Sequence, residues 1–209
     1  MPETKHIIVS PTVMSPTHYA SSDDFCRIFY EEADSLFRLS FLLTADCDKA
    51  ERSFVSGIED SVKGSHIFKE WARSWARRAV IQNAVRIINP KPTGENAPSG
   101  LSRGTTLAEE QVEISAILDL APFERFVFVM SVLEHYSEHE CSILLGCSRR
   151  DVIAARSLAL RELGNARELH AERQVGVGLE KQPPSDHRES IHLKPPGRLI
   201  AGLYRRCYA

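Results

Sequence analysis

Four arginines lie close together in the last third of the sequence, directly after a short turn. The turn is Gly146 to Ser148, and the helix expected from Ser148 to Leu163 carries Arg149, Arg150, Arg156 and Arg161. Guanidinium groups on one exposed helix can bind phosphate oxygens, and the second helix of a helix-turn-helix fits the DNA major groove. The pattern therefore predicts a DNA-recognition helix, packed through its inner face on residues that include Ile143. The alternative is a helical hairpin whose arginines are only solvated.

A second group of cations lies on the helix expected from Ile67 to Ile88, where Glu70 is the single acid. The group consists of Lys69, Arg73, Arg77, Arg78 and Arg86. Three aromatic residues are interleaved with it: Phe68, Trp71 and Trp75. Cations along one face of a helix, with rings beside them for unpaired bases, predict a surface that captures a single strand of DNA. The alternative is that the rings belong to the core.

One spacing is typical of metal chemistry. His135-x-x-Glu138-His139 matches a class of zinc peptidases in which both histidines lie on one continuous helix. Ser137 is a preferred N-cap residue, so we expect a helix to begin between the two histidines and their rings not to converge. Cys141 falls on the apolar side of that helix and is expected to be buried. We therefore predict no metal site. The sequence also contains no Gly-rich phosphate loop, no nucleophile elbow and no convincing pair of carboxylates, so we expect no cofactor and no enzymatic activity.

The elements that would position these residues are helical throughout, because no segment alternates as a strand does. Helices are expected at about 24–43, 48–62 and 67–88, followed by a Pro- and Gly-rich linker at 91–104. Capping signals then start helices at Thr106, Pro122, Ser137 and Ser148, and Gly146 closes the third of them. The sequence predicts an all-α protein of two small helical modules, 23–90 and 105–172, the second a helix-turn-helix. A disordered arm at 1–22 and a mostly disordered tail at 173–209 complete the prediction.

The composition excludes several classes of protein. Hydrophobic residues make up 43% of the 209 residues and charged residues 26%, which is a globular balance. The formal net charge of −2 means that any binding of nucleic acid must come from local patches. The five cysteines include no Cys-x-x-Cys pair, which argues against a disulfide scaffold or zinc ribbon and favours a cytoplasmic location. No apolar run reaches the length of a membrane span, so no membrane partner is expected.

Two stretches of the sequence resemble a known family. The later stretch contains Leu120-x-Pro-x-Glu124-Arg125-x-Val127-Phe128, Tyr136-Ser137-x-x-Glu140, Leu145-Gly146-x-Ser148 and Val152-x-x-x-Arg156-x-x-Ala159-x-x-x-Leu163. It resembles the fourth conserved region of bacterial RNA polymerase sigma factors of the extracytoplasmic-function type. The earlier stretch resembles the second region of the same family, through Leu36-Phe37-Arg38-Leu39-Ser40-Phe41-Leu42-Leu43-Thr44, Ala50-Glu51 and Trp71-x-x-x-Trp75-Ala76-Arg77. Together the two stretches cover roughly 25–163.

The resemblance implies a transcription initiation factor that directs RNA polymerase core to promoter DNA. The helix from Ser148 would read the upstream promoter element, with Arg149, Arg150 and Ala154 near base edges and Arg156 on phosphate. The loop at 64–67 and the helix after it would hold the opened strand of the downstream element through residues that include Arg73, Arg77 and Arg78. The helix at 48–62 would dock on the polymerase clamp, and an inhibitory anti-sigma protein is a further implied partner.

The sequence departs from the family pattern in its front half. Arg52-Ser53-Phe54-Val55-Ser56 replaces an acidic and glutamine-bearing docking pattern, and Arg78 and Gln82 replace a customary Asn and Asp. Two alternatives therefore stay open beside the sigma factor. One is a helix-turn-helix regulator that no longer binds polymerase core, and the other is a helical interaction protein without a DNA role.

Overall fold

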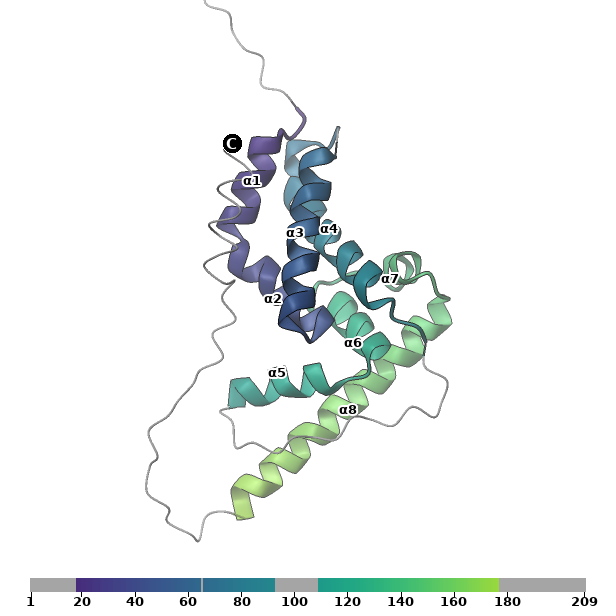
Figure 1. Cartoon of the computed structure of the whole chain (residues 1–209). Helices are drawn as coiled ribbons and strands as arrows, with labels where there is room; N and C mark the ends of the chain where they lie inside the picture. The colour runs from purple at the N-terminus through teal and green to yellow at the C-terminus, as the bar shows by residue number, and fades with distance from the viewer. Residues whose placement is uncertain (1–17, 65, 93–108, 177–209) are drawn as a thin grey trace, which may run out of the picture.

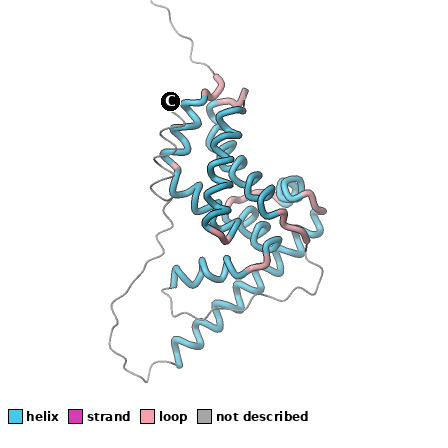
Figure 2. The backbone as a smooth tube through the Cα atoms, viewed as in Figure 1, coloured by secondary structure: helices cyan, strands magenta, loops and turns pink. Residues whose placement is uncertain are grey.

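The computed structural model describes residues 18–64, 66–92 and 109–176, and this part of the chain is all-α, as predicted (Figures 1 and 2). The helices are α1 (Ser22–Glu31), α2 (Ala33–Thr44), α3 (Cys47–Lys63), α4 (Ala72–Ile88), α5 (Glu109–Asp119), α6 (Pro122–Phe128), α7 (Glu138–Leu145) and α8 (Arg149–Gly176). A 3-10 turn, η1 (Lys69–Trp71), precedes α4, and a π-helical turn, η2 (Val129–Leu133), follows α6. Most of the predicted arm, linker and tail, and the predicted cap Thr106, lie outside the described residues.

The first long helix expected from the sequence is bent into two, α1 and α2, at Glu32. The hydrogen-bond ladder continues across the bend, because the Glu32 N–H donates to the Ile28 carbonyl and the Glu32 carbonyl accepts from the Leu36 N–H. The dihedral angles of Glu32, φ −105° and ψ 18°, lie outside the helical region. The prediction of one continuous helix at 24–43 was therefore wrong at this residue, whereas α3 and α4 match their predicted ranges within a few residues.

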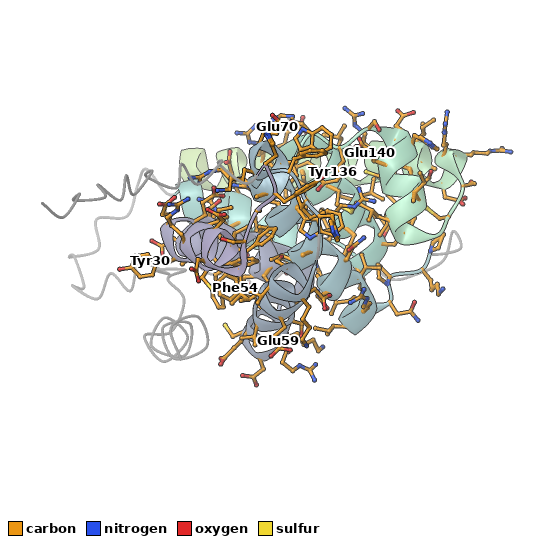
Figure 3. All side chains as sticks on the ribbon, turned by 90° about the horizontal axis from the view of Figure 1, so that it is seen from above. Tyr30, Phe54, Glu59, Glu70, Tyr136 and Glu140 are labelled. Carbon is orange, nitrogen blue, oxygen red and sulfur yellow. The ribbon has the colours of Figure 1, made fainter. Side chains whose placement is uncertain are left out.

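α1 to α4 pack around an aromatic core. Phe25, Phe29 and Phe54 are almost completely buried there, and the rings of Phe29 and Phe54 meet edge to face with their centroids 5.7 Å apart. Figure 3 shows Phe54 among these helices. Gly57 lets α3 approach α4 closely, because a Cβ at this position would lie 2.9 Å from Val80 Cγ2 and 3.2 Å from the Val80 nitrogen. The close packing explains a glycine inside a helix, which otherwise costs stability.

The second half of the chain packs around α6, which begins at Pro122 as predicted. Its buried residues form one cluster with residues from α2 and α4, which belong to the first half. The cluster includes Leu39, Leu42, Leu43, Ile81, Ala84, Phe123, Phe126, Val127, Val129 and Met130. The two predicted modules thus share a core, and the structure does not confirm them as separate units. In Figure 1, α1 to α4 lie above α5, α6 and the long α8.

α8 is longer than the sequence predicted. The expected end near Leu163 was wrong, because the helix passes through Gly164 and continues to Gly176. A glycine in an exposed helix costs about 1 kcal/mol, and the residues that follow are good helix formers that offset this cost. Arg167 also forms a salt bridge with Glu113 of α5, which holds the extension against the rest of the protein. Within the described residues, no helical segment combines the length and the apolar composition needed to cross a lipid bilayer.

Candidate nucleic-acid interface

α7, the turn after it and the start of α8 have the geometry that their capping residues predicted. The Ser137 hydroxyl accepts from the Glu140 N–H at 3.2 Å, and the Glu140 carboxylate accepts from the Ser137 N–H at 2.9 Å. Ser148 and Asp151 repeat this arrangement at the start of α8, with distances of 3.1 and 3.0 Å. Gly146 ends α7 with φ 64°, a left-handed conformation that favours glycine. A capped turn of a few residues therefore connects the two helices.

These caps also fix the charge state of their carboxylates. Hydrogen bonds from Ser137 lower the pKa of Glu140, and hydrogen bonds from Ser148 lower the pKa of Asp151. Both carboxylates therefore stay ionised well below neutral pH, where each carries a negative charge at the positive end of its helix. The N-terminal caps of α7 and α8 therefore keep their charged hydrogen bonds across the physiological pH range.

The inner face of α8 packs as expected on α6 and α7, with one exception. Val152, Ala155 and Ala159 are buried in the shared core, and Leu163 packs against it. Ile143 of α7 is 59% exposed, so the predicted contact between Ile143 and α8 was wrong. α7 contributes buried Cys141 and Leu145 to the core instead, and these positions leave Ile143 on the opposite side of the helix.

The outer face of α8 carries the predicted cations. Arg149, Arg150 and Arg161 are exposed and Arg156 is half-buried, while Ala154 and Ser148 are exposed beside them. Within the described part of the chain, none of these four guanidinium groups forms a salt bridge. The side chains of Arg149, Arg150 and Arg161 therefore face solvent.

The cations of η1 and α4 are in a different situation, because most of them contact carboxylates of other helices. Arg73 forms salt bridges with Glu31, at 2.8 Å, and with Glu32. Arg77 binds the Glu134 carboxylate at 2.9 Å and lies 3.6 Å from Glu32. The remaining two pairs are Lys69 with Asp24 at 3.5 Å and Arg86 with Asp60 at 2.9 Å. The predicted strand-capture surface is thus largely neutralised by acids of α1 and α3, by Glu32 at the bend and by Glu134 directly after η2.

The aromatic residues of this region lie around a pocket between the two halves of the protein. Trp71 is 60% exposed and Phe68 is 38% exposed, so neither is a core residue, whereas Trp75 is half-buried against the aromatic core. The pocket has a volume of about 560 Å³. Its first wall comes from η1, the start of α4 and the loop before them, and its second from the segment between η2 and α7.

The two histidines of the zinc-type spacing do not lie on one continuous helix. His135 has φ 58° and precedes α7, which begins at Glu138, so His135 and His139 lie on different segments, as the Ser137 cap predicted. No group of three or more His, Cys, Asp or Glu side chains in the described ranges could hold a metal ion. Cys141 is fully buried, as predicted, and burial raises the pKa of its thiol to about 11.

Sequence reasoning missed the role of Arg125, which joins the two halves. The side chain is 6% exposed and donates hydrogen bonds to the carbonyls of Leu43, Leu118 and Leu120, at 3.2, 3.0 and 3.0 Å. Burial lowers the pKa of Arg125, whose guanidinium is held by carbonyl dipoles rather than by a carboxylate. The available signal was a pair of adjacent charged residues, Glu124 and Arg125, inside the otherwise apolar run after Pro122.

Comparison with models of known protein families, with curated proteins and with solved structures finds no match to this chain.

Proposed function

We propose that this protein binds duplex DNA through α7, the turn and α8, with α8 as the recognition helix. One observation supports this above all: Arg149, Arg150, Arg156 and Arg161 of α8 form no salt bridge within the described residues, whereas the cations of α4 largely do. A guanidinium without an internal carboxylate partner keeps its full attraction for phosphate, because no existing pair has to be broken. The capped turn and the buried inner face of α8 set its orientation relative to the rest of the protein.

The arginines have different roles in this proposal. Arg149 and Arg150 lie in the first turn of α8, the end of a recognition helix that contacts base edges in the major groove. Arg156 and Arg161 lie further along the helix and would bind the phosphate backbone, which positions the protein without reading sequence.

The wider role in this proposal is transcription initiation, as a sigma-type factor that brings RNA polymerase core to promoter DNA. It is supported by the resemblance of residues 120–163 to the fourth region of that family. An inhibitory anti-sigma protein remains an implied partner. Strand capture by Lys69, Arg73, Trp75, Arg77 and Arg78 is the weaker part, because Arg73 and Arg77 would first have to release their carboxylates.

A second candidate is a helix-turn-helix regulator that acts without polymerase core. It is favoured by the packing of α3, the helix that would dock on the polymerase clamp. Ser53 and Phe54, which replace polar docking residues of the family, are fully buried and serve the core of the protein. A pull-down with purified polymerase core separates the two candidates, since only the first predicts stable binding.

The test of the proposal combines promoter selection with two single variants. Transcription with polymerase core on random promoter DNA yields the site, which is then used in equilibrium binding. We expect Arg149→Ala to relax base preference within the site and Arg156→Ala to weaken all sequences alike. If neither substitution alters binding to the selected site, α8 is not the recognition helix.

A further inference from the structure

The pocket between the two halves has a built lining that the proposed DNA contacts do not use. Phe68, Trp71 and Trp75 provide three aromatic rings from the first half, and Tyr136 provides a fourth from the second. Figure 3 shows Tyr136 and Glu140, another lining residue, on the same side of the molecule as Glu70 of η1. A volume of about 560 Å³ lies within the range of small-molecule sites. Rings on both sides favour a flat aromatic ligand.

The polar groups of the lining are unequally satisfied. The Glu134 carboxylate accepts from Arg77 at 2.9 and 3.0 Å, and the Glu140 carboxylate accepts from the Ser137 N–H and hydroxyl. In contrast, Arg78 forms no salt bridge or hydrogen bond within the described residues, although its charge helps to lower the pKa of Glu140.

Within the described residues, the indole N–H of Trp75 is also buried without an acceptor. Of the charged or buried polar groups that line the pocket, the two without a partner in the described residues, Arg78 and the Trp75 indole, are therefore both donors, and one of them is a cation. A ligand that satisfies these groups must bring acceptor atoms and a negative charge.

Backbone strain points to the same place. Four residues other than glycine have positive φ among the described residues, and two of them, Ala45 and Asn89, end helices in the left-handed conformation usual there. The other two, His66 with φ 71° and His135 with φ 58°, both line the pocket, one from each half. Strained residues persist where the surrounding structure holds them, and they cluster at ligand sites.

The charge distribution around the pocket favours a small anion over a DNA strand. A strand needs a row of free cations for successive phosphates. Next to the pocket, however, Lys69, Arg73 and Arg77 are occupied by Asp24, Glu31, Glu32 and Glu134. A single available guanidinium matches one carboxylate.

We propose that this pocket binds a small planar aromatic carboxylate, with its ring among Phe68, Trp71 and Tyr136 and its carboxylate on Arg78. Because both halves line the pocket, the ligand would stabilise their packing against each other. The inference goes beyond DNA binding by α8 and does not depend on it.

The full chain offers a direct probe, because its two tryptophans both line the pocket. We would titrate 2-naphthoate by calorimetry and follow tryptophan fluorescence, with neutral 2-naphthamide and the non-planar cyclohexanecarboxylate as matched ligands. Saturable binding of 2-naphthoate is expected, at least tenfold tighter than either matched ligand. Arg78→Gln should weaken it about tenfold or more, the loss expected for one charged hydrogen bond, and Trp71→Ala should weaken it as well.

Arg86→Gln is the matched control, because Arg86 lies on the same helix and outside the pocket lining, and it should leave 2-naphthoate binding unchanged. Circular dichroism would verify that each variant is folded. The inference is overturned by absence of saturable binding up to about 1 mM, by equal binding of the amide, or by equal binding to the Arg78 variant. Saturation of the pocket by a single-stranded oligonucleotide, without binding of 2-naphthoate, would assign it to nucleic acid instead.

Discussion

Arg125→Met should destabilise the protein by about 3 kcal/mol. The guanidinium bonds Leu43 in the last turn of α2, and Leu118 and Leu120 at the end of α5, so it caps the carboxyl ends of two helices at once. Substitution by methionine fills the space but removes three hydrogen bonds to a charged group, each worth about 1.5–3 kcal/mol. It also removes the cost of burying the charge, which offsets part of this loss. The expected net loss in the free energy of unfolding is about 3 kcal/mol.

Urea denaturation, followed by circular dichroism, measures this loss. For a slope of about 2 kcal/mol per M, the midpoint should fall by about 1.5 M. Arg38→Met is the matched control, because Arg38 is exposed on α2, and its midpoint should stay within about 0.3 M of the original protein. A shift for Arg125→Met that is no larger than this control would refute the idea that the buried guanidinium joins the halves.

Three further predictions follow from the packing and the caps. Gly57→Ala should lower the free energy of unfolding by about 1 kcal/mol, because the clash of the new Cβ with Val80 outweighs the gain of about 1 kcal/mol in helix propensity. Thermal unfolding measures this change, and an increase in stability would contradict the close contact. At neutral pH, iodoacetamide should modify exposed Cys47 before Cys141, whose thiol is buried and has a pKa of about 11; peptide mass spectrometry identifies the sites, and equal rates would contradict the burial. The pKa of Glu140 is lower in the folded protein than its ordinary value of 4.5, so its ionised form stabilises the fold above pH 4.5, and this stability is lost as the pH falls through the folded pKa. Glu140→Gln should therefore make the free energy of unfolding depend less on pH in the acid range, and an unchanged dependence would exclude this contribution.

The features that sequence predicted best are those decided within a few residues. The Ser137 and Ser148 caps, the left-handed Gly146 and the helix start at Pro122 depend on hydrogen bonds and steric limits over three or four positions, and all appear as predicted. The same local chemistry separated His135 from α7 and so argued against the zinc site.

The features that sequence could not predict depend on contacts far apart in the chain. Arg77 and Glu134 are 57 positions apart, and no periodicity indicates that the cationic face of α4 meets acids of other elements. The shared core could not be predicted for the same reason. The apolar faces of α2 and α6 have the same sequence pattern whether they pack within one module or against the other module. The bend at Glu32 leaves the hydrophobic pattern intact, so periodicity did not detect it.

The salt dependence of duplex DNA binding tests the central claim most directly. The full chain would be titrated on the selected duplex at several salt concentrations, beside a variant with Arg149, Arg150, Arg156 and Arg161 all changed to Ala. Two phosphate contacts, from Arg156 and Arg161, predict a log–log slope of about −2 for the original protein, and a slope near zero with much weaker binding for the variant. Equal slopes and affinities for the two proteins would contradict DNA recognition by α8.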